Sequence, residues 1–261
     1  MSEHDGRWTE GTPCWSDLGV PDVDAARTFY TDVFGWHVED GPAEAGGYVT
    51  ALLGGRPVAG IGPLTGEGQP PSWTAYLATD DVYAITARVI TAGGSVLTPA
   101  FDVLDAGRMA IAADPTGAVV GLWQAGAHDG SGRVNEPGAP CWAEVHTRDA
   151  EAAKAFYTAL FGWSYDVFGD PSEPYASAKL PGAPAEADPV AGVFAPPGGL
   201  PEGVPAYWLT WFGSDDTDGT VDLAVQRGGT ALMEPFDSPF GRSAIVLGPQ
   251  GEVFGVVAMP A

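Results

Sequence analysis

The chain contains the same sequence block twice. Residues 11–36 read GTPCWSDLGVPDVDAARTFYTDVFGW and residues 138–163 read GAPCWAEVHTRDAEAAKAFYTALFGW, so the copies start 127 residues apart (138 − 11) and align without a gap. A second block, which surrounds Arg108, recurs around Arg242. This spacing is that of a whole domain, because solenoid units repeat every ~20–50 residues. The sequence therefore predicts two copies of one domain.

A linker marks the boundary between the copies. Residues 126–139 (GAHDGSGRVNEPGA) are rich in Gly and polar residues and show no periodicity. We therefore predict a first domain over residues 1–127 and a second over residues 128–261. Both are of ordinary domain size.

Composition narrows the classes of partner. The chain has 11 Lys and Arg against 34 Asp and Glu, a formal net charge of −23, and such a surface repels nucleic acid and anionic lipid. Its two cysteines, Cys14 and Cys141, stand at equivalent positions, which argues against a disulfide framework or a metal site of several thiolates. The sequence shows no apolar run of ~20 residues and no secretory signal. We therefore expect a cytoplasmic protein.

Each half is predicted to hold two βαβββ units. Asp22 and Asp149 each follow a short strand and precede apolar residues at helical spacing, and Gly35 and Gly162 end those helices. A second strand and helix follow in each half, with paired Asp residues at the helix start and paired Gly residues at its end. The expected fold is α+β, with four such units forming curved mixed sheets that carry helices on one face.

The helices carry a motif that resembles a known family. Both first helices end in Phe-Tyr-x-x-x-Phe-Gly-Trp, at 29–36 and 156–163, and an Asp-Pro-x-Gly hairpin at 114–117 has become Gly-Pro-Gln-Gly at 248–251. These features resemble the vicinal-oxygen-chelate superfamily, the fold of glyoxalase I, bleomycin-resistance proteins and extradiol dioxygenases. The resemblance covers essentially the whole chain. It is strongest to two-domain actinobacterial members described as glyoxalase-like proteins or as hydroxylases, some of which sit near aromatic polyketide pathways.

The resemblance also says where a metal would be held. Metal-dependent members use His, Glu or Gln seven residues before each helix-capping Asp, four residues after the hairpin Gly, and on the fourth strand. The corresponding positions here are Trp15, Thr74, Trp142, Leu209, Gly121 and Gly255, and the fourth-strand segments PVAGIGP and PVAGVFA offer no such ligand. The resemblance therefore implies no catalytic metal. It argues against glyoxalase and extradiol activity, because both chemistries use the metal as the electrophile.

Metal-dependent members hold the ion in a cup formed by the curved sheet. Strand alternation predicts which polar groups of this chain face that cup in place of metal ligands. One face of each first strand carries Trp15, Asp17 and Gly19 in the first half and Trp142, Glu144 and His146 in the second. A carboxylate two residues from an imidazole suits acid–base chemistry, so Glu144, His146 and Asp17 are the predicted catalytic residues. Two alternatives stay open: His146 faces solvent or a turn, and Asp17 and Glu144 are buried partners of Arg108 and Arg242.

Aromatic residues and arginines are the predicted ligand-binding groups. The aromatic candidates, which suit stacking on a flat ring, are Trp15, Trp142, Trp73, Tyr76, Trp208 and Trp211. Arg108 and Arg242 are candidate binders of an anion or carbonyl. Gly121 and Gly255 are interpreted as leaving room for a ligand. Core packing is the alternative explanation for the tryptophans.

These observations favour a metal-independent enzyme acting on an aromatic or carbonyl metabolite in natural-product tailoring. No Walker A loop or Rossmann fingerprint is found, and we expect no cofactor. The alternative is a protein that sequesters an antibiotic or metabolite, as bleomycin-resistance relatives do; a third is an interaction protein with vestigial cups. Two halves in one chain can replace a homodimer, so we expect a monomer.

The first prediction concerns metal content. Because the family's ligand positions carry indole, methyl and glycine groups, purified protein should hold far less than about one Fe, Mn, Ni or Zn ion per half, measured by ICP-MS after dialysis against a chelator. About one tightly bound transition metal per half would contradict this expectation.

Overall fold

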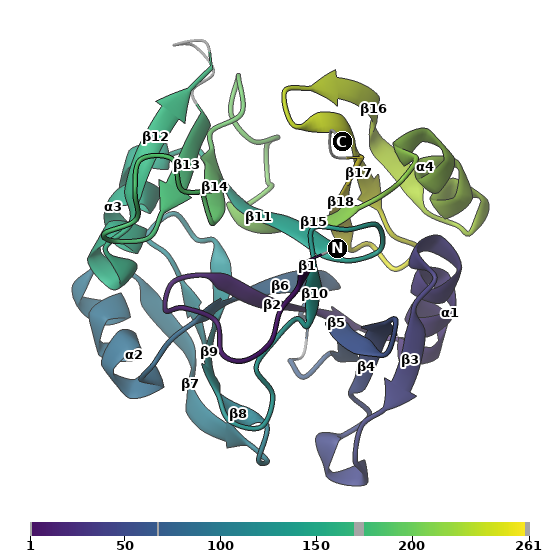
Figure 1. Ribbon diagram of the computed structural model, residues 1–261, viewed down its shortest axis with the longest axis horizontal. Coiled ribbons are helices and arrows are strands. Elements are labelled where there is room, and N and C mark those ends of the chain that lie inside the picture. The colour runs from purple at the N-terminus through teal and green to yellow at the C-terminus, as the bar shows by residue number, and fades with distance from the viewer. Residues whose placement is uncertain (1, 67, 170–174, 259–261) are drawn as a thin grey trace.

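The computed structural model describes residues 2–66, 68–169 and 175–258, and it contains the four predicted βαβββ units (Figure 1). The first half consists of β2 (Pro13–Val20), α1 (Val23–Phe34), β3 (His37–Asp40), β4 (Val49–Leu53) and β5 (Arg56–Pro63), then β6 (Ser72–Ala78), α2 (Val82–Thr91), β7 (Ser95–Val103), β8 (Gly107–Ala113) and β9 (Val119–Ala125). A short 3-10 helix, η1 (Ala43–Ala45), lies between β3 and β4.

The second half repeats this order. Its elements are β11 (Pro140–His146), α3 (Ala150–Phe161), β12 (Ser164–Phe168), β13 (Tyr175–Lys179) and β14 (Ala191–Phe194), then β15 (Tyr207–Gly213), α4 (Thr217–Gln226), β16 (Thr230–Ser238), β17 (Gly241–Leu247) and β18 (Val253–Ala258). Two short strands, β1 (Ser2–Glu3) and β10 (Arg133–Val134), pair the N-terminal segment with the linker.

Each half forms one eight-stranded mixed sheet, as predicted. The strand orders are β3-β4-β5-β2-β6-β9-β8-β7 and β12-β13-β14-β11-β15-β18-β17-β16. Within each unit the first strand pairs in parallel with the last, whereas the other pairs are antiparallel. The α+β class and the four units are therefore confirmed.

The helix ends follow from local chemistry. The side chains of Asp22, Asp81, Asp149 and Asp216 each accept a hydrogen bond from a backbone N–H in the first turn of the helix that follows. Helix α1 ends at Gly35, which adopts the left-handed conformation that favours glycine, and α3 ends in the same way.

The two sheets lie back to back through their central strands. β6 contacts β15, and the hydroxyl of Ser16 on β2 lies 3.1 Å from that of Thr210 on β15. Helix α1 packs against α4 on one side of the molecule and α2 against α3 on the other, so the concave faces open in opposite directions (Figure 1). We call the concave face of the first half cup 1 and that of the second half cup 2.

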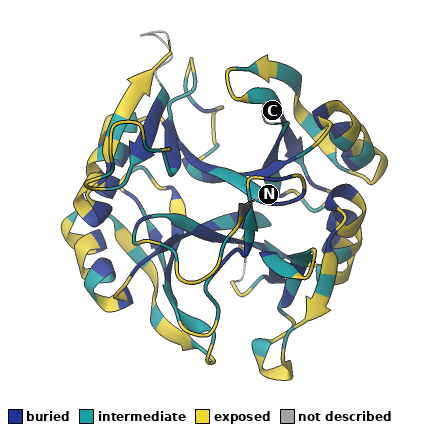
Figure 2. Ribbon diagram, in the orientation of Figure 1, coloured by how far each residue is buried: buried dark blue, intermediate teal, exposed yellow. Residues whose placement is uncertain are grey.

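The core beneath the helices is shared between the halves (Figure 2). One buried cluster joins residues of the second unit, such as Ile85, to residues of the third, such as Phe156. Another joins Tyr30 of the first unit to Phe212 and Phe254 of the fourth. Burial of apolar surface therefore holds the two copies together.

The repeated helix motif also forms hydrogen bonds across this interface. The hydroxyl of Tyr30 donates to Glu252 of the other half at 3.0 Å, and that of Tyr157 donates to Asp114 at 3.2 Å. Burial raises the pKa of Glu252, and the negative charge of its carboxylate adds to the effect of burial in raising the pKa of Tyr30. Both tyrosines therefore act as donors.

The tryptophan that ends each motif makes a second pair of crossing bonds. The indole N–H of Trp36 donates to the carbonyl of Gly138 at 2.6 Å, and that of Trp163 donates to the carbonyl of Gly11 at 3.1 Å. Gly11 and Gly138 both have positive φ. A Cβ on Gly11 would meet the Phe161 side chain at 2.9 Å, so the close approach of the halves requires glycine there.

The second half lacks the Asp that opens the first hairpin, but another carboxylate occupies its place. Asp114 opens the first hairpin, whereas Gly248 stands at the equivalent place in the second. A Cβ on Gly248 would overlap the carboxylate of Glu252, so this longer side chain, four residues later, reaches the place that an Asp would fill. The Tyr30 hydroxyl consequently finds a carboxylate in the same position.

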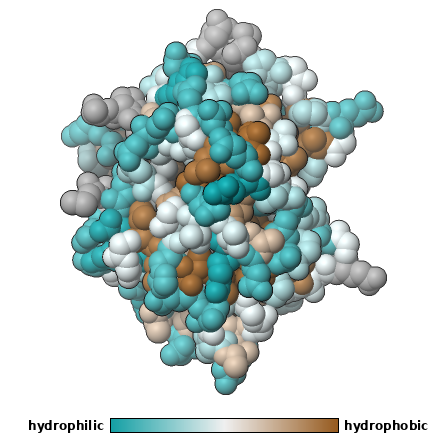
Figure 3. Space-filling view, turned by 90° about the vertical axis from the view of Figure 1, so that its right-hand side faces the viewer, coloured by the Kyte–Doolittle hydropathy of each residue, from teal (hydrophilic) through white to brown (hydrophobic). Residues whose placement is uncertain are grey.

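The surface reflects the acidic composition. The side of the molecule that carries α1 and α4 is hydrophilic over most of its area, with apolar groups in separate small patches (Figure 3). Over the described residues, no helix combines the length and apolarity that a membrane crossing needs.

The interface tyrosines generate a stability prediction. Tyr157→Phe removes the partner of Asp114 and also the acceptor of the Trp208 indole N–H, 2.8 Å away, so it should lower the free energy of unfolding by about 2 kcal/mol in urea denaturation. Tyr30→Phe should act similarly. The matched control is Tyr83→Phe, at an exposed tyrosine, which should change little. Equal effects of all three substitutions would contradict the role of these bonds.

Candidate functional site

Cup 2 is organised around the carboxylate of Glu144 on β11. It accepts hydrogen bonds from the Tyr175 hydroxyl at 2.5 Å and from the Trp211 indole at 3.1 Å, and its Oε1 lies 2.7 Å from Nε2 of His146. Only 5% of Glu144 and 5% of His146 is exposed. The expected carboxylate–imidazole pair is therefore formed and buried, and the alternative of a solvent-facing His146 is wrong.

A third polar residue, Tyr207, lies beside this pair. When the Nε2–H group of a neutral His146 donates a hydrogen bond to Glu144, Nδ1 is an acceptor. The Tyr207 hydroxyl lies 3.4 Å from this Nδ1 atom. The imidazole stacks on the Tyr207 ring at 5.0 Å and meets the edge of Phe194 at 5.4 Å. Tyr207 is half-buried, so it is the most accessible residue of a Tyr207–His146–Glu144 relay.

The surroundings set the charge of this relay. Burial by itself would raise the pKa of Glu144, but the hydrogen bond and charge of His146, with bonds from Tyr175 and Trp211, outweigh it and hold that pKa below its usual value. Burial and the negative charge of Glu144 raise the pKa of Tyr207. Glu144 is therefore a carboxylate and Tyr207 a protonated phenol near neutral pH.

Cup 1 repeats the same framework around Asp17. The Tyr76 hydroxyl donates to Asp17 at 3.0 Å, Tyr48 also hydrogen-bonds to it, and the Trp15 indole donates to Tyr48 at 3.0 Å. In cup 2 the indole of Trp142 likewise donates to the hydroxyl of the tyrosine that binds Glu144, at 2.7 Å. Among the described residues, no imidazole hydrogen-bonds to Asp17, and burial raises its pKa to about 7 despite the tyrosine hydrogen bonds.

The cups differ at three adjacent positions. Across the strands of cup 2, His146 pairs with Phe194 and with Tyr207. In the same register of cup 1, Gly19 pairs with Gly62 and with Ser72. The space beside Gly19 is taken partly by Leu64, which a Cβ on Gly19 would approach to 3.2 Å. The relay is therefore a property of cup 2 alone.

Glycine at the closing strands serves packing. A Cβ on Gly121 would overlap the ring of Tyr76, and one on Gly255 would overlap the ring of Trp211. On the fourth strand of the first half, Gly60 lies equally close beneath the Tyr48 hydroxyl. The expectation that these glycines leave room for a ligand is wrong, because the chain's own aromatic rings fill the space.

Two of the predicted ligand-binding tryptophans lie on the other face of the sheet. Trp73 donates to the Tyr30 hydroxyl at 3.1 Å and Trp208 to that of Tyr157, both within the buried helix layer. Tyr76 and Trp211 line the cups with Trp15 and Trp142, as expected. Side chains an odd number of positions apart on a strand point to opposite faces of the sheet. Trp73 therefore faces away from Tyr76 on β6, and Trp208 faces away from Trp211 on β15.

The arginines stand apart from the central carboxylates. Arg108 is paired with Asp102 at 2.5 Å, and Arg242 with Asp218 at 2.9 Å and Asp237 at 3.3 Å. The alternative in which they neutralise Asp17 and Glu144 is wrong. Their role as ligand-binding residues stays a prediction.

The side chains at the family's ligand positions do not suit a divalent metal. At the positions that the resemblance assigns to ligands, Trp15 and Trp142 donate hydrogen bonds to tyrosines. Thr74 and Leu209 are the backbone register partners of Asp17 and Glu144 on the neighbouring strands. Within residues 2–66, 68–169 and 175–258, no group of three His, Cys, Asp or Glu side chains gathers. Glu144 already accepts three hydrogen bonds, which take up most of its acceptor capacity.

Comparison with known sequences gives one family. The model of the Glyoxalase/Bleomycin resistance protein/Dioxygenase superfamily matches residues 15–122 and 142–256. CFP32 of Mycobacterium bovis, which is provisionally named a glyoxylase, is 43% identical over 256 residues, covering 96% of this chain and 95% of the relative. The anthracycline biosynthesis proteins DauV of Streptomyces sp. (strain C5) and DnrV of Streptomyces peucetius are each 38% identical, covering 97% of this chain and 95% of the relative.

Solved structures agree on the fold. A Mn(II)-bound glyoxalase from Novosphingobium aromaticivorans matches with a TM-score of 0.65 at 16% identity, covering 96% of this chain and 83% of that one. The 2,2',3-trihydroxybiphenyl 1,2-dioxygenase of Sphingomonas wittichii matches with a TM-score of 0.64 at 17% identity, covering 96% and 91%. At these identities the likeness shows the fold alone.

The different surroundings of the two carboxylates generate a pH prediction. The folded-state pKa of Asp17, about 7, lies above its unfolded value near 4, so the folded protein loses stability as pH rises from ~4 to ~7. Asp17→Asn removes this loss. Relative to the wild type, it should gain roughly 2–3 kcal/mol in unfolding free energy between pH 4 and pH 8, after allowance for the partial exposure of Asp17.

Urea denaturation at several pH values measures this difference. Asp105→Asn, at an exposed position, is the matched control and should show no such pH dependence. An Asp17→Asn effect that stays constant across the pH range would show that ionisation of Asp17 is not responsible.

Proposed function

Because this chain belongs to the Glyoxalase/Bleomycin resistance protein/Dioxygenase superfamily, we propose that it is a small-molecule enzyme that works in cup 2 without a bound metal. The proposed substrate is an aromatic compound that bears a carbonyl or phenol oxygen, and the proposed role is tailoring of a natural product. The observation that carries the proposal is the Tyr207–His146–Glu144 relay, which cup 1 lacks. The names of the Streptomyces relatives, which are anthracycline biosynthesis proteins, support the substrate class.

In the proposed mechanism Tyr207 touches the substrate. Its raised pKa keeps the phenol protonated, so it donates a hydrogen bond to the substrate oxygen and passes a proton to or from His146. Glu144 fixes the imidazole tautomer and stabilises the imidazolium that forms when His146 takes the proton. Because Glu144 is buried and already accepts three hydrogen bonds, we assign it a positioning role in place of direct proton transfer.

The rim of cup 2 supports an aromatic ligand. The ring of Tyr175 lies 5.3 Å from that of Phe168, 5.9 Å from Phe194 and 5.6 Å from Phe240. Phe168 is 40% exposed and Phe240 50% exposed, so two large apolar rings stand open beside the relay. Offset stacking on these rings would hold a flat ligand.

The second candidate function is sequestration without chemistry. The same aromatic rim supports it, and the net charge of −23 would favour a cationic ligand. In either role we propose that the chain works as a monomer, since α1 packs on α4 and α2 on α3 within one chain. Of the two predicted domains, residues 1–127 and 128–261, the second would then bind the ligand.

Proton transfer can be tested without knowing the natural substrate. Anthrone is a flat three-ring ketone whose C10 protons are acidic. A hydrogen bond from Tyr207 to its carbonyl oxygen should stabilise the enolate while solvent takes the C10 proton, so the protein should accelerate exchange with D2O under anaerobic conditions, followed by NMR. Tyr207→Phe and Glu144→Gln should lower the exchange rate about 10²–10⁴-fold. Anthrone binding, measured by tryptophan fluorescence, should change by less than about threefold.

Three outcomes separate the readings. Binding of anthrone by the wild type without accelerated exchange would favour sequestration over catalysis. An equal loss of exchange in Asp17→Asn would show that both cups react. Neither binding nor exchange would overturn the proposed substrate class.

A further inference from the structure

Cup 1 is covered by a segment that precedes its first strand. Residues 4–10, which we call the strap, run from β1 to Gly11 across the lower sheet (Figure 1). Trp8 of the strap packs against the aromatic cluster that lines cup 1, which contains Trp15, Tyr76 and Trp123. An indole from outside the sheet therefore occupies the concave face.

The strap is anchored at both ends by polar contacts. Near its start, the Arg56 guanidinium binds Asp5 at 2.7 Å. Near its end, Thr79 donates to Glu10 at 3.2 Å, and the backbone N–H of Gly11 donates to Ala78 at 2.9 Å. The middle of the strap is held by packing.

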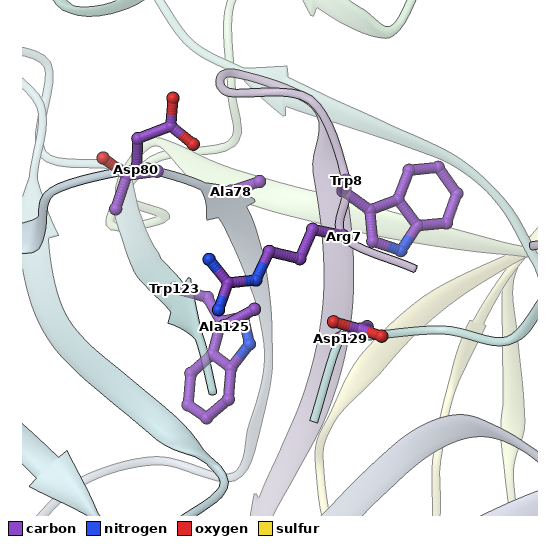
Figure 4. A pocket seen from close by; sticks show the side chains of 8 residues that line it. Arg7, Trp8, Ala78, Asp80, Trp123, Ala125 and Asp129 are labelled. Atoms are coloured by element: carbon purple, nitrogen blue, oxygen red, sulfur yellow. The ribbon is translucent and has the colours of Figure 1, made fainter. Parts of the chain in front are cut away.

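Little space remains beneath it. Figure 4 shows Arg7 extending from the strap toward Trp123 and Ala125, with the Trp8 indole turned the other way. The hollow between the strap and the sheet has a volume of about 10 Å³, room for at most about one water molecule. The hollow beneath the strap is therefore too small for an aromatic ligand.

Docking of the strap leaves polar atoms unsatisfied. The Trp8 indole and the His4 imidazole stack at 3.7 Å, yet Nε1 of Trp8 and Nε2 of His4 are buried without a hydrogen-bond partner. Burying a polar nitrogen without a partner is unfavourable. The middle of the strap is therefore held less firmly than a fully satisfied segment would be.

The repeat supplies an internal comparison. Cys14 is 1% exposed and Trp15 is 6% exposed, whereas their counterparts in cup 2, Cys141 and Trp142, are partly exposed. The difference arises from the strap and the start of the linker. Trp8 lies over Gly130, and a Cβ on Gly130 would meet the Trp8 indole at 3.1 Å and overlap the carbonyl of Cys14.

We propose that the strap is an autoinhibitory plug, in which Trp8 covers the part of cup 1 that an aromatic ligand would enter. His128 of the linker already packs on Trp15 at 4.5 Å and near Trp123 at 5.7 Å, so the strap is the second segment that covers this cluster. Removal of the strap opens the hollow beside Trp123, Ala78 and Ala125 to an aromatic ligand. This inference is independent of the reaction proposed for cup 2.

Cys14 reports on the plug, because it packs in the cup 1 cluster and the chain has one other cysteine. In a Cys141→Ser background, N-ethylmaleimide should label Cys14 slowly. Trp8→Ala, or a chain that starts at Gly11, should speed labelling at least tenfold. Trp8→Phe, which keeps an aromatic ring, should stay within about threefold of the parent.

The matched control uses the other thiol. In a Cys14→Ser background, Trp8→Ala should leave the labelling rate of Cys141 within about twofold. Millimolar indole should restore protection of Cys14 in Trp8→Ala by filling the vacated place, whereas cyclohexanol should not.

Unchanged Cys14 labelling in both Trp8→Ala and the shortened chain would overturn the plug. Equal acceleration of Cys14 and Cys141 would also overturn it, because it would mean general loosening. Faster labelling without protection by indole would overturn the assignment of cup 1 to aromatic ligands.

Discussion

The hydrogen bonds that each repeated helix motif makes to the opposite half fix the arrangement on which the rest of the structure depends. Tyr30 reaches Glu252, and Tyr157 reaches Asp114, each within a buried aromatic layer. These contacts join α1 and α3 each to the opposite half, and the two sheets pack back to back. Each cup is consequently built by one sheet alone and faces away from the other. Two copies of one sequence can therefore diverge in chemistry without disturbing the interface that joins them.

Aromatic side chains over glycine backbone define both cups. Where metal-dependent members of the family place ligands, this chain has Trp15 and Trp142, each bonded to a tyrosine that in turn binds the central carboxylate. Gly121 and Gly255 allow a further ring to lie flat on the closing strand. The carboxylate is thereby held by hydrogen-bond donors of the chain itself.

Divergence between the cups is concentrated in a few adjacent places. In one register, cup 2 has His146 between an aromatic residue and Tyr207, whereas cup 1 has Gly19 between a glycine and a serine. The imidazole accounts for the opposite pKa shifts of the two carboxylates, lowered for Glu144 and raised for Asp17. The strap adds a second asymmetry, since Trp8 packs against the cup 1 cluster, whereas Cys141 and Trp142 in cup 2 stay partly exposed.

The sequence by itself determined the duplication, the four units, the helix caps and the facing of Asp17, Glu144 and His146, because local periodicity and capping chemistry act over a few residues. It did not identify Tyr207 as a member of the relay, and it placed Trp73 and Trp208 in the cups. Only the tertiary structure decided which side chains meet Glu144, since its partners come from strands 31 and 67 residues away. Alternation fixes the face of a side chain within a strand, but register and bulges, such as the shift between Pro140 and Trp142, decide what lies opposite.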